Sequence, residues 1–176
     1  MSGPLLVVVG PPGSGKTTVG TAVAAALGVP FRDTDADVEA QTGTTIADLF
    51  VQQGEPHFRA LEERAIARAL AEHEGVLALG GGAVTSPVTR ELLVAHGAAG
   101  GTVVWLDVDV ASAAKRVGLS RARPLLAVNP RAMLRTMLEA RAPLYAEVST
   151  VIVSTAARPV QDVVAEVLTA VGSVAP

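Results

Sequence analysis

A glycine-rich stretch with one lysine and two hydroxyls follows the first apolar run of this 176-residue chain. Gly10, Gly15, Lys16 and Thr17 fill the pattern G-x-x-x-x-G-K-[ST], whose spacing lets backbone N–H groups surround an anion. Lys16 would then reach the outer phosphates of a nucleotide, and Thr17 would offer its hydroxyl to Mg²⁺. The alternative is a strand-to-helix turn whose glycines serve packing alone, which leaves the Lys-Thr pair unexplained. We therefore expect a triphosphate-binding loop here.

Two carboxylates follow the next short apolar stretch. Asp33 and Asp35 lie in "RDTDAD", directly after Val29-Pro30-Phe31, which we interpret as the second strand. Because the functional crevice of a parallel sheet lies at the carboxyl ends of its strands, both side chains would face the phosphate loop. One carboxylate would hold Mg²⁺, usually through water, and the other would orient an acceptor hydroxyl toward the γ-phosphorus. The alternative is that each aspartate only caps the following helix.

A second glycine run ends the third predicted strand, in "VLALGGGAVTSP". Backbone without side chains at Gly80, Gly81 and Gly82 would let a ligand approach main-chain N–H groups closely. The alternative is a flexible turn. Because this strand carries no terminal aspartate, the magnesium role would fall to Asp33.

Three arginines are candidates for contacts with an anionic substrate. Arg59 follows Phe58, Arg123 precedes Pro124, and Arg141 precedes "APLY". Taken alone, each is more often a solvated surface charge than a ligand group. A planar guanidinium suits both phosphate and carboxylate, and a lid that brings one in on closure would exclude water from the reaction.

Alternating segments predict the elements that position these residues. Short Val/Leu-rich runs alternate with Ala-rich stretches of helical period, which is typical of βαβ units around a parallel sheet. The runs are apolar throughout, so we expect helices on both faces of each strand. Cap signals predict helices that begin near Thr45, Pro56, Pro87 and Pro130, and one that ends at Gly28.

The composition narrows the class of protein. The length fits one domain with a continuous core. The net charge of -3, with basic residues spread along the chain, disfavours nucleic acid as a partner. No apolar run reaches the roughly 18 residues of a membrane span. The absence of cysteine excludes disulfides and thiolate metal sites and agrees with a cytoplasmic protein. We expect a cytoplasmic protein without a membrane or nucleic-acid partner.

Taken in order, these motifs resemble those of the shikimate kinase family, small P-loop kinases of aromatic amino-acid biosynthesis. The resemblance runs from Leu5 to Val164 and includes "GPPGSGKTT", "DTD", "GEPHFRALEE", "LGGGAVTSP", "RPLL", "RAPLY" and "ARP". It implies transfer of the γ-phosphate of MgATP to the 3-hydroxyl of shikimate. It also implies a three-layer α/β/α fold with a central five-stranded parallel sheet. Residues 1–176 would form a single monomeric domain with a mobile lid at about 117–128.

The resemblance assigns the nucleotide side of the site. The phosphates would contact Lys16 and the loop residues Gly13, Ser14, Gly15, Thr17 and Thr18. Mg²⁺ would be held by Thr17 and, through water, by Asp33. The adenine would be lined by Arg116, Arg158 and Pro159. Arg123 would be the lid arginine that reaches the phosphates, and it is chosen over Arg121 because "PLL" follows it.

On the acceptor side, the resemblance makes Asp35 the ligand of the substrate hydroxyls and the general base. The substrate carboxylate would be bound by Arg59, Arg141 and the backbone of Gly80 to Gly82. With an ordinary pKa near ~4, Asp35 would be a poor base at neutral pH. We therefore expect it to orient the hydroxyl first and to take the proton late, as suits a loose phosphoryl transfer.

Three alternatives stay open. A gluconate kinase or a nucleoside-monophosphate kinase shares the phosphate loop, although the glycine run with "DTD" argues against both, and we find no base-recognition pocket for a nucleotide acceptor. A catalytically silent nucleotide-binding module would share it too. Such a module is expected to lose Lys16, Asp35 or the arginines, and this chain has all of them.

Overall fold

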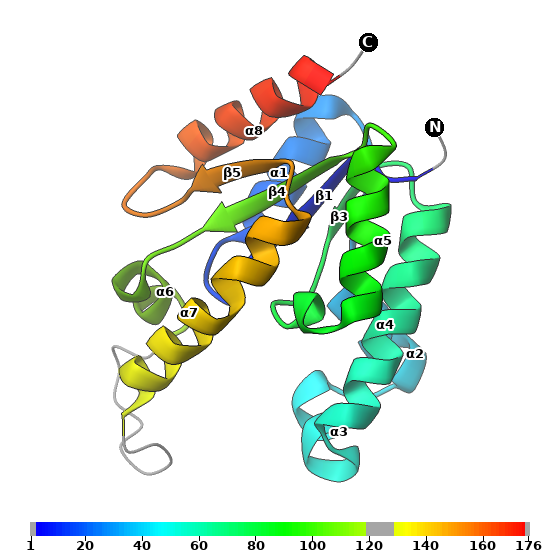
Figure 1. The fold of residues 1–176 in the computed structure, drawn as a ribbon, viewed down its shortest axis with the longest axis vertical. Coiled ribbons are helices and arrows are strands. Elements are labelled where there is room, and N and C mark those ends of the chain that lie inside the picture. Colours follow the sequence, from blue (N-terminus) through cyan, green and yellow to red (C-terminus); the bar gives the residue numbers. More distant parts are fainter. Residues whose placement is uncertain (1–2, 119–128, 175–176) are drawn as a thin grey trace.

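The architecture was taken from a computed structural model, which describes residues 3–118 and 129–174 (Figure 1). Its sheet has the order β2-β3-β1-β4-β5, and every neighbouring pair is parallel. The strands are β1 Leu6–Val9, β2 Phe31–Asp33, β3 Val76–Ala78, β4 Thr102–Asp107 and β5 Val151–Ser154. This confirms the predicted five-stranded parallel sheet. β1 pairs with both β3 and β4, so the chain leaves the centre of the sheet in opposite directions. Parallel sheets bind their ligands at such a switch point, outside the carboxyl ends of the strands.

The helices that cap signals predict begin within one residue of the expected positions. They are α1 Lys16–Leu27, α2 Thr34–Thr42, α3 Ile46–Gln53, α4 Glu55–Glu72, α5 Pro87–Ala98, α6 Val110–Arg116, α7 Pro130–Val148 and α8 Val160–Val174, with a 3₁₀ turn at Ala83–Thr85. Side-chain oxygens of Thr45, Ser86 and Asn129 accept hydrogen bonds from backbone N–H groups three residues further on. Gly28 ends α1 in the left-handed conformation, as predicted.

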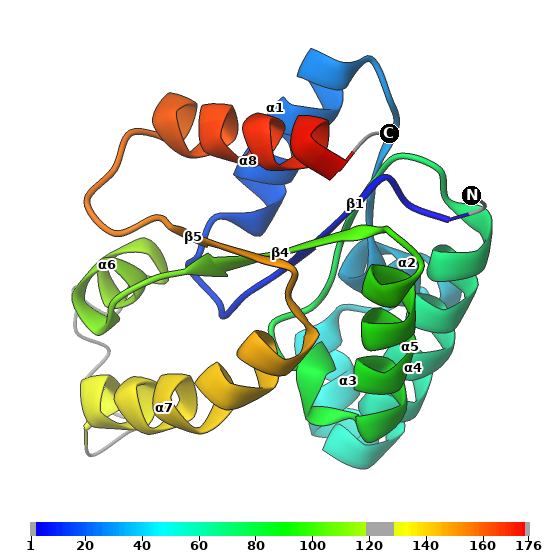
Figure 2. The same ribbon diagram turned by 45° about the horizontal axis from the view of Figure 1, so that its top comes forward.

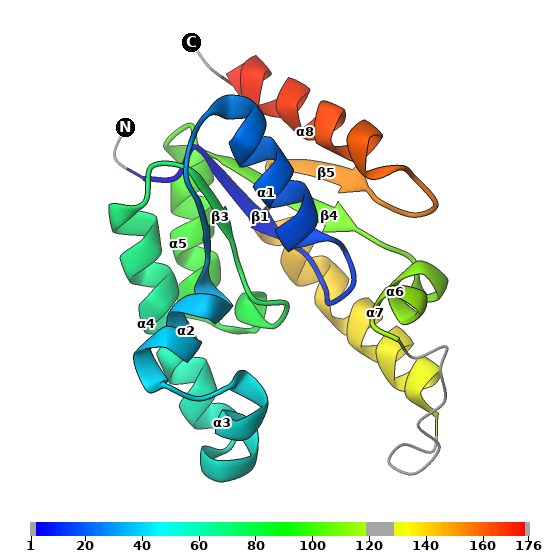
Figure 3. The same ribbon diagram turned by 180° about the vertical axis from the view of Figure 1, so that it is seen from behind.

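Two helical layers enclose the sheet (Figures 2 and 3). On one face, α1 and α8 bury a cluster that includes Leu6 and Val8 of β1. On the other face, α4, α5 and α7 bury a cluster that includes Val7 and Val9 of the same strand. The three layers are therefore those expected for an α/β/α sandwich. The predicted cover on both faces is wrong for the edge strand β5, because Ile152 is 53% exposed on the face where α7 packs against β4 instead.

A smaller cluster joins α2, α3 and α4 beside the edge strand β2. Val38, Leu49, Phe58 and Ala65 are buried in it. The second strand is displaced from the predicted Val29–Phe31, so Asp33 is its last residue rather than part of the loop that follows. The reason is the register, in which Phe31 pairs with Val76 and Asp33 with Ala78. Asp33 is thus fixed by the sheet itself.

Within the described ranges 3–118 and 129–174, no helix is both long and apolar enough to cross a membrane. The predicted lid at 117–128 lies almost entirely outside these ranges, and so do Arg121 and Arg123.

Candidate active site

The phosphate loop joins β1 to the amino end of α1. Its shape is set by Gly13 and Gly15, whose φ values of +79° and +91° favour glycine. The carbonyl of Pro11 accepts hydrogen bonds from the Lys16 ammonium and from the Ser14 N–H, both at 3.1 Å. No side chain caps α1, so its first N–H groups and its positive dipole end are left for an anion.

Lys16 lies in an environment that weakens its hold on the proton. Burial lowers its pKa to about 8, while the carboxylates of Asp35 and Asp33 oppose that shift and Arg141 adds to it. The negative charge of a bound nucleotide phosphate would stabilise the protonated form of Lys16. The lysine therefore suits a ligand that brings several negative charges of its own.

The two residues predicted to hold Mg²⁺ are in contact. The Thr17 hydroxyl donates to Oδ2 of Asp33 at 3.3 Å. The other carboxylate oxygen of Asp33 accepts from the Asp35 N–H at 2.9 Å and so caps α2. The capping alternative therefore holds for Asp33, but one oxygen stays directed at Thr17. A hydroxyl and a carboxylate oxygen at the end of the phosphate loop fit the oxygen ligands that Mg²⁺ requires.

Asp35 lies in the first turn of α2 and has a buried carboxylate oxygen, Oδ1, without a hydrogen-bond partner in the described ranges. Burial raises the pKa of Asp35 to about 6, with further contributions from Asp33 and Glu62. Lys16 and Arg59 oppose the shift. The expectation of an ordinary pKa near ~4 is therefore wrong, because desolvation disfavours the charged form. A carboxylate of this pKa accepts a proton at neutral pH more readily.

Glu62 is a residue that the sequence analysis missed. Its side chain is only 3% exposed, and Oε2 accepts from Nη1 of Arg59 at 2.6 Å. Its other oxygen, Oε1, is buried without a partner in the described part of the chain. Burial raises the pKa of Glu62 against the opposing effect of Arg59. The available signal was its place three residues after Arg59, on the face of α4 that carries Phe58 and Ala65.

Each glycine of the second run makes room for a different neighbour. A Cβ atom at Gly80 would lie 2.5 Å from the free oxygens of both Asp35 and Glu62. One at Gly81 would lie 2.8 Å from the Pro12 ring of the phosphate loop, and one at Gly82 would overlap the Arg59 guanidinium. The run is therefore a close-packed junction between the loop, the carboxylates and an arginine, not a flexible turn.

The two predicted carboxylate-binding arginines reach this junction from opposite elements. Arg59 extends from α4, is bound to Glu62 and Glu55, and has its guanidinium 5.2 Å from the centroid of the Phe58 ring. Arg141 extends from α7 and donates to the Gly81 carbonyl at 3.1 Å. The structure thus brings two guanidinium groups, two carboxylates and the glycine backbone together beside the phosphate loop.

The residues predicted to line an adenine also lie together. Arg116, Arg158 and Pro159 line one pocket of about 570 Å³. Arg116 donates to the Gly13 carbonyl at 3.0 Å and to the Thr155 hydroxyl at 2.9 Å, which ties α6 to the phosphate loop. A smaller pocket of about 130 Å³ continues toward the loop between the two arginines and Ser14, Gly15 and Thr18.

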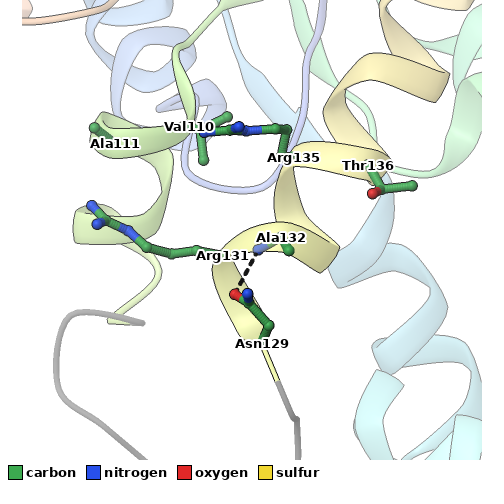
Figure 4. Close-up of a pocket in the computed structure, with 7 residues that line it drawn as sticks. All are labelled: Val110, Ala111, Asn129, Arg131, Ala132, Arg135 and Thr136. Atoms are coloured by element: carbon green, nitrogen blue, oxygen red, sulfur yellow. Dashed lines mark hydrogen bonds between the residues drawn. The ribbon is translucent and has the colours of Figure 1, made fainter.

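A further pocket lies between the start of α6 and the start of α7 (Figure 4). It measures about 450 Å³, and its lining contains none of the residues that the sequence analysis proposed. The figure shows Asn129 capping α7 through the Ala132 N–H, with Arg131 directed toward α6. This pocket is separate from the junction of carboxylates and glycines.

Comparison with known proteins identifies the relatives of this arrangement. The family model described as shikimate kinase matches residues 12–172. A shikimate kinase of Salinispora arenicola is 56% identical over 164 residues, which cover 93% of this chain and 95% of that protein. A shikimate kinase of Frankia casuarinae is 57% identical over 152 residues, which cover 86% of this chain. That protein is longer, and the match spans only 65% of its length. The solved structure of shikimate kinase from Acinetobacter baumannii in complex with shikimate has a TM-score of 0.87 and 36% identity, and the match covers 98% of this chain and 94% of that one.

Proposed function

The chain belongs to the shikimate kinase family, and on that premise we propose that it transfers the γ-phosphate of MgATP to the 3-hydroxyl of shikimate, giving shikimate 3-phosphate and ADP. The observation that carries the proposal is the buried carboxylate of Asp35, whose Oδ1 has no hydrogen-bond partner among the residues that the structure describes. It adjoins the phosphate-loop lysine on one side and an arginine-lined glycine junction on the other. A hydroxyl bound there would be aimed at a nucleotide held by the loop.

On the donor side, Lys16 and the amino end of α1 would bind the phosphates, with Gly13, Ser14, Gly15 and Thr18 around them. Thr17 and Asp33 would hold Mg²⁺, which when bound neutralises charge on the β- and γ-phosphate oxygens. Arg116, Arg158 and Pro159 would enclose the adenine. Arg123, in the proposed lid at 117–128, lies outside the described residues, and its role is proposed from the family resemblance alone.

On the acceptor side, the carboxylate of shikimate would lie between Arg59 and Arg141. Its hydroxyls would donate to Oδ1 of Asp35, which has no other partner in the described ranges. As the phosphorus–oxygen bond forms, the hydroxyl proton would pass to Asp35.

Finer features remain proposals as well. We propose a single kinase domain over 1–176 that acts as a monomer in the cytoplasm. The gluconate kinase and nucleoside-monophosphate kinase alternatives are disfavoured by the family match over residues 12–172. A catalytically silent module is disfavoured because Lys16, Asp35, Arg59 and Arg141 meet at one edge of the sheet.

A coupled ADP-release assay tests the proposal. Shikimate, gluconate and a set of nucleoside monophosphates are offered as acceptors with MgATP. We expect turnover with shikimate that exceeds every other acceptor. Turnover with gluconate or a nucleotide instead would identify that compound as the acceptor and contradict the proposal. No turnover with any of them would favour a nucleotide-binding module.

A further inference from the structure

The Gly81 carbonyl accepts two hydrogen bonds from α7. The Tyr145 hydroxyl donates to it at 2.5 Å, and Nη1 of Arg141 donates at 3.1 Å. The two residues are four apart on one helix, so they lie one above the other on the same face. A carbonyl oxygen has two lone pairs, and both are occupied here.

From this contact we infer that Tyr145 is a positioning residue of the acceptor site, whose hydroxyl holds the Gly81 peptide and Arg141 in the arrangement that receives the acceptor carboxylate. The inference rests on the proposed function. It adds a residue that the sequence motifs and the family resemblance did not assign. Tyr145 acts through Gly81 and Arg141 and is not a catalytic residue.

The peptide plane explains how a bond to a carbonyl affects binding. Because the peptide unit is planar and trans, fixing the Gly81 carbonyl also fixes the Gly82 N–H, which points the opposite way. Among the described residues, no hydrogen bond uses the N–H of Gly81 or Gly82. These are donors suited to a carboxylate, and Tyr145 sets the direction of one of them.

Arg141 is held by the same carbonyl. Its bond to Gly81 uses one donor of the guanidinium and leaves the rest of the planar fork for the acceptor. Tyr145 keeps the carbonyl in place when the arginine turns toward a ligand, since the Tyr145 bond is the shorter one. Without the hydroxyl, the Gly81 peptide would no longer be held in place. The directions of the Gly82 N–H and of the Arg141 guanidinium would then no longer be fixed.

Tyr145 is built to be rigid and to remain a donor. It is 1% exposed, and its ring stacks on Trp105 with centroids 5.6 Å apart. Burial raises its pKa to about 12, so the hydroxyl keeps its proton throughout the physiological range. A buried aromatic ring that carries a hydroxyl bonded to site backbone does more than fill the core.

The first test removes only the hydroxyl. Tyr145→Phe is expected to raise KM for shikimate about tenfold, the effect of losing one ordinary hydrogen bond, and to leave KM for ATP within about twofold. The control away from the site is Thr150→Val, which removes a hydroxyl that donates to the Val103 carbonyl and accepts from the Val103 N–H near the amino end of β4. That control is expected to keep the wild-type KM for shikimate.

The inference is overturned if Tyr145→Phe keeps the wild-type KM for shikimate, even with lowered stability, or if both KM values rise equally. Wild-type turnover with shikimate, measured in parallel, distinguishes these results from failure of the proposed function itself.

A second measurement does not depend on the folding of a variant. Tyr145 is the only tyrosine of the chain, so growth with 3-fluorotyrosine labels this position alone. We expect the ¹⁹F resonance to shift when shikimate is added and to stay in place when ADP is added. A resonance that saturating shikimate leaves unmoved would contradict the inference.

Discussion

At the scale of single residues, burial gives Asp35 a pKa that suits the proton transfer we propose for it. The carboxyl lies close to Lys16 and Glu62, and its pKa of about 6 is set chiefly by lost hydration. The same burial has a cost in stability. The unfolded chain releases the Asp35 proton near pH ~4, whereas the folded chain keeps it up to about pH 6. The native state is therefore disfavoured by this group as pH rises through that interval.

Asp35→Asn is expected to lower kcat by at least about 10²-fold, because the positioned proton acceptor is lost. It should also be more stable than the wild type above pH 6, and the difference should vanish below pH 4. Turnover by coupled assay and urea unfolding at several pH values measure the two effects. Turnover near the wild-type rate would show that Asp35 is not the proton acceptor.

The pH dependence of the wild-type enzyme follows from two groups. We expect kcat/KM for MgATP to rise with pH through about 6, as Asp35 ionises, and to fall above about 8, as Lys16 loses its positive charge. Lys16→Arg is the control, since arginine stays charged and its residual activity should have no alkaline limb. An alkaline limb that persists in this variant would assign it to another group.

At the scale of elements, the glycine run after the third strand matters because its residues have no side chains. Three glycines follow shortly after the end of β3 at Ala78. The space that their side chains would fill is taken by Asp35 and Glu62 from α2 and α4, by Pro12 from the phosphate loop and by Arg59 from α4. None of the three needs a left-handed backbone. Their value is close approach, so even alanine should disturb the site.

Gly82→Ala tests this directly. The backbone at Gly82 has φ -98° and ψ 0°, which alanine can adopt, but the added Cβ would overlap the Arg59 guanidinium. We expect KM for shikimate to rise at least about tenfold, since the arginine must leave its place, a loss of roughly 1.4 kcal/mol or more in binding.

The control for this substitution is Gly172→Ala in α8, where a Cβ meets nothing within 4 Å. It should keep the wild-type KM and stabilise the fold by about 0.5–1 kcal/mol through helix propensity. Equal KM values in both variants would mean that Gly82 serves the turn only.

At the scale of the whole molecule, the proposed donor and acceptor sites are built by different elements at the carboxyl ends of the strands. The phosphate loop, Thr17 and Asp33 form the proposed metal-binding side, whereas α4 and α7 supply Arg59 and Arg141 from the opposite helical layer. Neither Arg59 nor Arg141 is a predicted metal ligand. The two sites should therefore respond differently to removal of the metal.

Treatment with EDTA is expected to abolish turnover and excess Mg²⁺ to restore it. Thermal stabilisation by shikimate should survive the chelator, since the acceptor site that we propose consists of guanidinium groups and backbone amides. At a shikimate concentration of 100 times Kd, the stabilisation should amount to about 2.7 kcal/mol with or without EDTA. Loss of the shikimate effect in EDTA would show that the metal also organises the acceptor site.

The sequence by itself determined the features that obey local rules. The spacing of Gly10, Gly15, Lys16 and Thr17 predicts a loop before a helix. Helices begin directly after three cap residues whose side chains bond backbone N–H groups three residues further on: Thr45, Ser86 and Asn129. Short apolar runs that alternate with helical segments predicted a parallel sheet, although not which strands pair. The loop and the caps depend on neighbours that are close along the chain.

Only the tertiary structure decided what depends on distant neighbours. The shifted pKa of Asp35 comes from burial under other elements, Arg141 donates to a carbonyl 60 residues away, and Tyr145 reaches the same carbonyl from 64 residues away. The end of β2 at Asp33 is set by its pairing with β3. Desolvation and long-range hydrogen bonds arise when segments pack together, and no local pattern records them.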